Sequence, residues 1–221
     1  MQDAVAEFLR APLWAQIAMV AFALGLVVSV TGSFFAKRRF RGRFMAIAQT
    51  LGARVPNGSG WPATFPVTID GRAFEIRHAL VSTGRNSSYR GPHGHLLTTA
   101  TRLYGERWPL HQVDISLMGK LISRITGGTP STGDPGFDAR FRLREDGLKV
   151  RAGWLDAAVR DEVTRVFDGI PSDSLIAIQE GELLITLREP WKGIDGTAVR
   201  ALLGRQVALA AALQRTASGR H

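Results

Sequence analysis

The chain of 221 residues contains no cysteine. Without thiols it cannot form disulfides, hold a metal or an iron–sulfur cluster through cysteine, or use a cysteine nucleophile. Acidic residues are in deficit, with 19 Asp and Glu against 28 Lys and Arg, which gives a formal net charge of +9. The mean hydropathy is 0.00, so apolar and polar stretches balance, and their positions along the chain have to be located.

One long stretch lacks charge altogether. The 26 residues from 11 to 36 contain no Asp, Glu, Lys or Arg. As a helix they extend roughly 39 Å, against roughly 30 Å for the hydrocarbon core of a bilayer. A buried core helix is the alternative, but core helices rarely run so far without a charge. The stretch predicts one transmembrane helix over residues 11–36, with interface anchors on both sides: Trp14, Phe34, Phe35 and Phe40.

Cations cluster directly after this stretch: Lys37, Arg38, Arg39, Arg41 and Arg43. Because they follow the apolar run rather than precede it, the segment is expected to stay as an anchor and not to be cleaved as a signal peptide. The positive-inside rule then places residues 1–10 outside and the rest in the cytoplasm of a bacterial inner membrane. The same cations are expected to contact anionic lipid headgroups, so the bilayer is a predicted partner.

Small residues recur every fourth position within the apolar stretch, at Ala21, Gly25, Ser29 and Ser33. Such a ridge permits close approach of a second helix, whereas a chance alignment of common small residues is the plain alternative. If the ridge is used, its partner is a helix of another integral membrane protein or of a second copy of the chain.

The remaining sequence divides by composition. The expected parts are an external N-terminus (1–10), the transmembrane helix (11–36), a basic neck helix and linker (37–62), a cytoplasmic domain (63–215) and a flexible tail (216–221). In the domain, Asp70-Gly71 lies between two stretches of alternating hydrophobicity and predicts a hairpin, and Gly181 predicts another.

The strand and helix patterns of the domain indicate an α+β fold with an antiparallel sheet and two or three helices. Strands are predicted at 96–103, 112–117, 137–143 and 148–150. A short helix is predicted at 118–125, and longer amphipathic helices at 155–167 and from Asp195 to about Arg215. Glycine-marked βαβ units are missing, which argues against a doubly wound nucleotide-binding fold.

Histidines form the densest group of possible metal ligands, at His93, His95 and His111. Imidazole binds many divalent metals, but solvent-exposed loop histidines explain the same pattern. His111 and Asp114 lie three residues apart, so in a strand they point to opposite faces. No metal and no cofactor is therefore predicted, and a metal or small-ligand site in this loop is kept as the alternative.

Other chemistry finds little support in the sequence. Gly127–Gly136 resembles a phosphate loop in its glycines, but Asp134 and Pro135 follow Gly133 where a Walker motif requires Lys and Ser or Thr. The G-x-S-x-G pattern of serine hydrolases is missing. Beyond Arg54 the cations are mixed with acids, so no nucleic-acid partner is expected.

The stretch from Thr132 to Leu143 (TGDPGFDARFRL), followed by Gly153-Trp154-Leu155-Asp156 and a helix, resembles an FDxxFxv strand–helix pattern of uncharacterised bacterial single-span membrane-anchored proteins. In layout, although not in motifs, the chain is similar to the H-type subunit of photosynthetic reaction centres. A retained span with its small-residue ridge, a basic neck and a domain without a catalytic set together predict a non-catalytic accessory or scaffold subunit of an integral membrane assembly, photosynthetic or respiratory. The alternative is a membrane-tethered enzyme or ligand-binding domain that uses the histidine loop.

Overall fold

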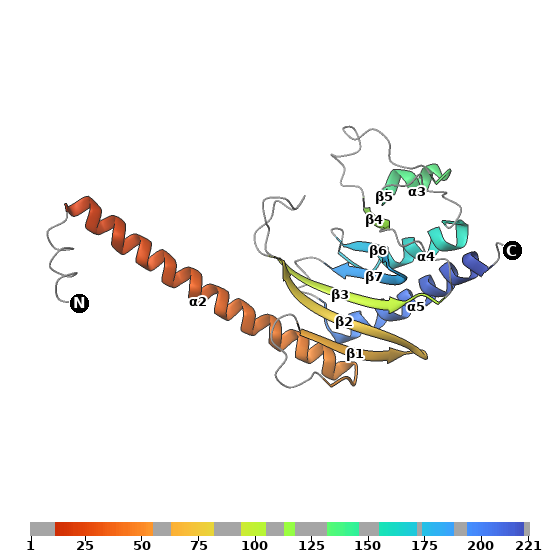
Figure 1. The fold of residues 1–221 in the computed structure, drawn as a ribbon, viewed down its shortest axis with the longest axis horizontal. Helices are drawn as coiled ribbons and strands as arrows, with labels where there is room; N and C mark the ends of the chain where they lie inside the picture. Colours follow the sequence, from red (N-terminus) through yellow and green to blue (C-terminus); the bar gives the residue numbers. More distant parts are fainter. Residues whose placement is uncertain are drawn as a thin grey trace. The chain divides into compact units, whose positions relative to one another are not determined.

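The structure is a computed structural model. It describes residues 12–54, 63–81, 94–104, 113–117, 132–145, 155–171, 174–187 and 194–218. The chain forms two compact units, Met1–Phe44 and Met45–His221. Figure 1 shows their elements: the long helix α2, of which all but the last turns belong to the first unit, and a sheet with helices α3, α4 and α5 in the second.

Helix α2 (Leu13–Thr50) is a single continuous element of 38 residues. The carbonyl of Pro12 accepts from the main-chain N–H groups of Ala15 and Gln16, at 2.8 and 3.2 Å, so the helix begins directly after the proline. The predicted change from membrane helix to neck at residue 37 is not a helix break, and Gly42 does not interrupt the helix either.

The prediction of a transmembrane helix over residues 11–36 is wrong. Among the residues that the structure describes, no helix is long and apolar enough to cross a membrane. The apolar stretch of α2 with described side chains, Leu13–Val28, spans about 24 Å, which is shorter than the roughly 30 Å hydrocarbon core. Further along, the same helix carries Arg38, Arg39 and Arg41 on its exposed surface. The single-pass topology and the inner-membrane location, which depended on this span, are corrected with it.

The sheet has seven strands in the order β1-β2-β3-β7-β6-β4-β5, and every neighbouring pair is antiparallel. Its strands are β1 (Ala63–Ile69), β2 (Arg72–Val81), β3 (Gly94–Arg102), β4 (Val113–Leu117), β5 (Phe141–Glu145), β6 (Leu175–Gln179) and β7 (Glu182–Leu187). The first three strands join the last hairpin where β3 pairs with β7, with Thr99 opposite Ile185. The antiparallel sheet and the mixed α and β content agree with the sequence patterns.

Two tight turns fix the predicted hairpins. Asp70 and Gly71 connect β1 to β2 with φ angles of 49° and 76°, and Glu180 and Gly181 connect β6 to β7 with 50° and 77°. Two consecutive residues with positive φ are the signature of the type I′ turn, whose twist matches that of the paired strands. Glycine adopts this conformation without steric cost, which is why both turns carry it at the second position.

Three helices accompany the sheet: α3 (Pro135–Arg140), α4 (Ala157–Phe167) and α5 (Gly196–Ser218). Helix α5 contacts β1 and packs against α4. Asp156 caps α4 by accepting from Val159 N at 2.9 Å, and Asp195 caps α5 by accepting from Ala198 N at 2.8 Å. Helix α5 is amphipathic, as predicted, and its buried stripe includes Val199, Leu202, Leu203, Leu209 and Leu213.

Helix α3 replaces the first half of a predicted strand. Residues 137–143 alternate in hydrophobicity, but Pro135–Arg140 are helical and the strand begins only at Phe141. The cause lies just upstream, where the carboxylate of Asp134 accepts from Gly136 N and Phe137 N at 3.0 and 3.1 Å. An Asp cap followed by Pro at the first helical position starts a helix despite the alternating pattern.

Several predicted segments lie outside the described residues: the linker at 56–62, the helix at 118–125 and the strand at 148–150. A polar loop is also predicted at 81–95, but its ends belong to β2 and β3, and only residues 82–93 lie outside the description.

Candidate interaction surfaces and polar clusters

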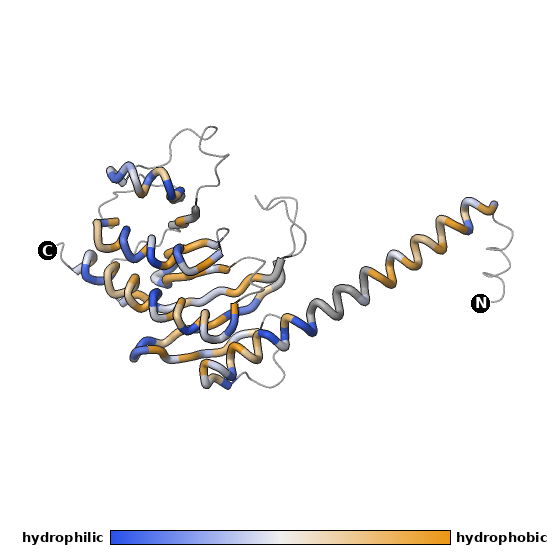
Figure 2. Tube along the Cα trace, turned by 180° about the vertical axis from the view of Figure 1, so that it is seen from behind, coloured by the Kyte–Doolittle hydropathy of each residue, from blue (hydrophilic) through white to orange (hydrophobic). Residues whose placement is uncertain are grey.

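The N-terminal half of α2 is largely apolar, as the hydropathy colours of Figure 2 show, and its large apolar side chains are exposed. Ten large apolar residues of this half are between 47 and 74% exposed: Leu13, Trp14, Ile17, Met19, Val20, Phe22, Leu24, Leu26, Val27 and Val28. Soluble proteins rarely expose a contiguous apolar surface of this size unless it binds something. We define residues Leu13–Val28 as the apolar segment of α2.

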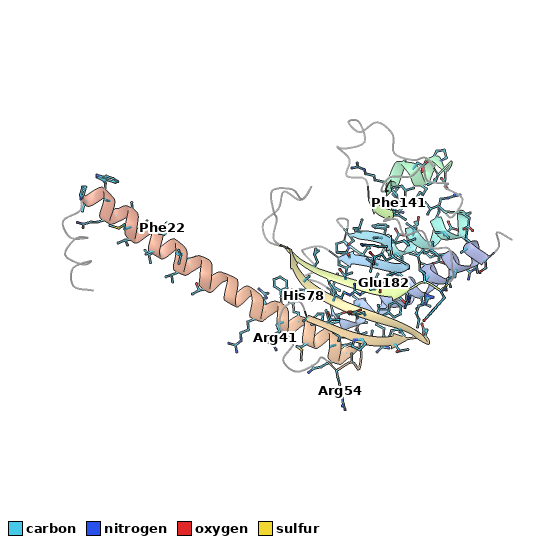
Figure 3. The ribbon with its side chains drawn as sticks, in the orientation of Figure 1. Phe22, Arg41, Arg54, His78, Phe141 and Glu182 are labelled. Carbon is cyan, nitrogen blue, oxygen red and sulfur yellow. The ribbon has the colours of Figure 1, made fainter. Side chains whose placement is uncertain are left out.

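The predicted anchors and cations distribute unevenly along α2. Trp14 is 74% exposed, whereas Phe40 is 9% exposed and therefore buried. Arg38, Arg39 and Arg41 are exposed and Arg43 is half-buried; Figure 3 labels Arg41 and Phe22 on the helix. The side chains of Phe34, Phe35 and Lys37 lie outside the described residues. The predicted headgroup contact depended on the membrane span, and among the described residues no helix is long and apolar enough to form one.

The predicted small-residue ridge is described in its first half. Ala21 and Gly25 are exposed, and a side chain added at Gly25 would meet no atom within 4 Å. The side chains of Ser29 and Ser33 lie outside the description. The packing of another helix against this ridge stays a prediction.

The side chains of the three predicted histidines lie outside the described part of the chain. His93 and His111 lie outside the described residues, and His95 is described only through its main chain in β3, opposite Leu80. Within the described ranges, no three His, Asp or Glu side chains are placed to hold a metal ion.

A buried polar cluster lies between α5 and the sheet. The side-chain amide of Gln206 donates to the main-chain oxygens of Leu183 at 2.8 Å and Thr99 at 3.2 Å, and its oxygen accepts from the Thr99 hydroxyl at 2.6 Å. Both side chains are fully buried. The amide nitrogen and oxygen of Gln206 and the hydroxyl of Thr99 all have hydrogen-bond partners within the cluster. The cluster therefore holds α5 against β3 and β7 and offers no group to a ligand.

Sequence reasoning overlooked Gln206, although a signal was present. The residue lies on the same helical stripe as Leu202, Leu203 and Leu209, where a polar side chain has to find partners inside the core.

The outward face of the sheet carries a charged group. Arg77 in β2 contacts Glu75 at 2.8 Å on its own strand and Glu182 in β7 at 3.5 Å. The hydrogen bond from Arg77 lowers the pKa of the Glu75 carboxyl and raises the pKa of Arg77 itself. All three side chains are more than a third exposed, so the group contributes little stability and mainly sets the local charge.

Arg72 lies at the end of the first hairpin, against the last turns of α5. It donates from Nη2 to Gln214 Oε1 at 2.7 Å, and its guanidinium lies 5.6 Å from the ring centre of Tyr104. Partial burial lowers the pKa of Arg72 from its ordinary value. Its positive charge lies near the C-terminal end of a helix, where it opposes the negative end of the helix dipole.

A compact turn precedes α3. Asp138 accepts from the main-chain N–H and the hydroxyl of Thr132, at 3.0 and 2.7 Å. Asp134 lies 3.3 Å from Arg160 in α4, as an ion pair, and Arg140 pairs with Asp168 at the end of α4. The two ion pairs attach α3 and its cap to α4. The carboxylates of Asp134, Asp138 and Asp168 therefore all have partners within the protein.

A comparison of the chain with protein families and with curated proteins finds no match. The resemblances drawn from residues 132–156 and from the layout of the chain therefore stay predictions. The strongest functional feature of the described residues is the apolar segment of α2.

Proposed function

We propose that the protein is a non-catalytic accessory or scaffold subunit of a larger protein assembly, attached through the apolar segment of α2. The observation that carries this proposal is the exposure of ten large apolar side chains on that segment. The membrane location predicted from the sequence is not part of the proposal.

The exposed side chains surround the helix instead of forming one stripe. At about 100° per residue, Trp14, Phe22 and Met19 project about 100°, 180° and 240° away from Leu13. A surface helix of a globular protein is apolar on one side only, and a helix that is apolar all round is normally buried. One partner helix covers only one side, so the segment fits a site between several protein surfaces.

Burial of these side chains against other proteins would release a large free energy. Complete burial of one large aliphatic or aromatic side chain stabilises by roughly 1.5–3 kcal/mol. Ten side chains that are about half exposed therefore supply on the order of 10 kcal/mol, from which the entropic cost of association has to be subtracted.

Native mass spectrometry of the tagged full chain, purified from its own cells at natural abundance, tests the proposal. We expect a complex that contains other proteins at fixed stoichiometry, and we expect Phe22→Glu to release them. The matched control is Ala201→Glu, which adds the same charge at an exposed position of α5 and should leave the complex intact. Recovery of this chain without any other protein would overturn the proposal.

The alternative function, a metal or ligand site in the histidine loop, has a separate test. Metal analysis of the purified protein is expected to give no stoichiometric zinc, manganese or iron. A metal that is lost on His95→Ala would contradict the non-catalytic role and favour a site in the histidine loop.

A further inference from the structure

Five of the exposed side chains of the apolar segment repeat with the spacing of a coiled coil. Leu13, Ile17, Val20, Leu24 and Val27 follow one another at intervals of four and three residues, and each is between 49 and 73% exposed. At about 100° per residue they stay within about 40° of Leu13 around the helix axis. This is the a/d pattern whose side chains fit between those of a facing helix. We define these five residues as the seam.

The seam is separate from the rest of the apolar surface. Met19, Phe22 and Leu26 project about 180–240° from Leu13, on the opposite side of the helix. A helix that packs along the seam therefore leaves this opposite side free. The two sides can take different partners, and substitutions on one side serve as controls for the other.

Charge along α2 selects the orientation of a facing copy. Arg38 and Arg41 continue the seam spacing and are exposed, so a parallel, in-register pair would place arginine against arginine. An antiparallel pair keeps these arginines at opposite ends. The sequence before α2 contains Asp3 and Glu7 against one Arg10, so the antiparallel pair also directs the acidic end of one chain toward the basic stretch of the other.

The seam matches itself in one antiparallel register. When Val20 faces Leu24 of a second copy, Ile17 faces Val27 and Leu13 faces Thr31, and every seam residue receives a partner. The seam, with Trp14 and Val28 beside it, offers on the order of 700 Å² of exposed apolar surface, taking about 150 Å² for each large side chain. Stable interfaces bury about 800 Å² per partner, so the available area is close to what a dimer needs.

We propose that two copies of this chain pair antiparallel through the seam Leu13, Ile17, Val20, Leu24 and Val27. The inference rests on the proposed role of α2 as the attachment element and names the partner of one of its sides. The opposite side, with Phe22, remains for other subunits of the assembly.

Disulfide trapping tests the register directly, because the chain contains no cysteine of its own. Full-length Val20→Cys and Leu24→Cys proteins are mixed and oxidised. The antiparallel register brings these two positions together, so we expect the mixed disulfide to dominate. Disulfides between two Val20→Cys chains would indicate the parallel pair and overturn the proposal. Met19→Cys, on the opposite side, is the control and should not form a disulfide with either variant.

Light scattering of the untagged full chain measures the mass in solution. We expect twice the chain mass of 24.1 kDa, and we expect Val20→Asp to weaken dimerisation by at least about 100-fold because it buries an unpaired carboxylate. Phe22→Glu should leave the dimer intact.

Two outcomes overturn the dimer: a wild-type monomer at tens of micromolar, and a monomer that sediments with phosphatidylglycerol-containing vesicles. A monomer that still co-purifies with other proteins overturns only this inference. A dimer without other proteins supports the inference and overturns the proposed function.

Discussion

Gln206 in α5 and Thr99 in β3 exchange hydrogen bonds in both directions. The threonine hydroxyl donates to the glutamine side-chain oxygen at 2.6 Å, and the glutamine amide donates to the threonine main-chain oxygen at 3.2 Å. Both residues are fully buried, so the pair determines how the last helix sits on the middle of the sheet.

We expect Gln206→Leu to lower the free energy of unfolding by about 2 kcal/mol, because the Thr99 hydroxyl and the Leu183 carbonyl lose a buried partner. Urea denaturation measures the change. Gln179→Leu, at an exposed position of β6, is the matched control and should change stability by less than about 0.5 kcal/mol. Adding Thr99→Val to Gln206→Leu should cost less than the sum of the two single changes.

A substitution at Gly196, the first residue of α5, should also change the stability of the protein. A Cβ atom at Gly196 would lie 2.2 Å from Thr50 Cβ at the end of α2, so Gly196→Ala forces the two helix ends apart. We expect a loss of about 1–3 kcal/mol in thermal or urea unfolding. In the same helix, a Cβ at Gly204 meets nothing within 4 Å. Gly204→Ala should therefore stabilise the protein by up to about 1 kcal/mol, and equal effects of the two substitutions would refute the packing argument.

Asp156 predicts a pH dependence. The Thr216 hydroxyl, and after it the main-chain N–H of Val159, lowers the pKa of this carboxyl below its ordinary value. A pKa that is lower in the folded state gives stability that is present above the unfolded pKa, near 4, and that disappears as the pH falls through the folded pKa.

We expect Asp156→Asn to cost about 0.5 kcal/mol at pH 7, because the site is largely exposed and its charge is screened, and we expect this cost to shrink as the pH falls through the folded pKa of Asp156. Carboxyl NMR titration of Thr216→Val should show the pKa of Asp156 closer to its ordinary value. An unchanged titration in this variant would assign the shift to the helix end alone.

The start of α3 allows a test of local structure. Asp134→Ala removes both hydrogen bonds to the first turn and the ion pair with Arg160, so we expect a loss of about 1 kcal/mol. Asp161→Ala, on the exposed surface of α4, is the control for loss of one negative charge. Equal unfolding midpoints for the two variants would contradict the capping role of Asp134.

Local patterns predicted the hairpins and the two longer helices of the second unit. Asp70-Gly71 marks a turn because two positive φ angles are needed there, and Asp156 and Asp195 mark helix starts because their side chains cap free N–H groups. Each of these signals lies within a few residues of the structure that it determines.

Other features depend on distant or competing interactions. Nothing in the sequence near Thr99 indicates that β3 pairs with β7. The sequence also does not indicate that Gln206 provides hydrogen bonds to Thr99 in β3 and to Leu183 in β7. At Phe137 the alternating pattern competed with the cap at Asp134, and the cap determined the conformation. The absence of charge at 11–36 suggested a membrane span, yet no helix among the described residues is long and apolar enough to cross a membrane, and Leu13–Val28 carries exposed apolar side chains.

The pairing of β3 with β7 also affects synthesis of the protein. While the ribosome extends the chain, Gly94–Arg102 has its β7 neighbour only after Glu182–Leu187 has emerged, some eighty residues later. The first three strands therefore leave the exit tunnel while the edge of β3 that pairs with β7 still lacks its hydrogen-bonding partner. The pairing of β3 with β7 is thus a late step of sheet formation. Nascent chains that stop before residue 182 should be far more sensitive to protease than those that extend through α5.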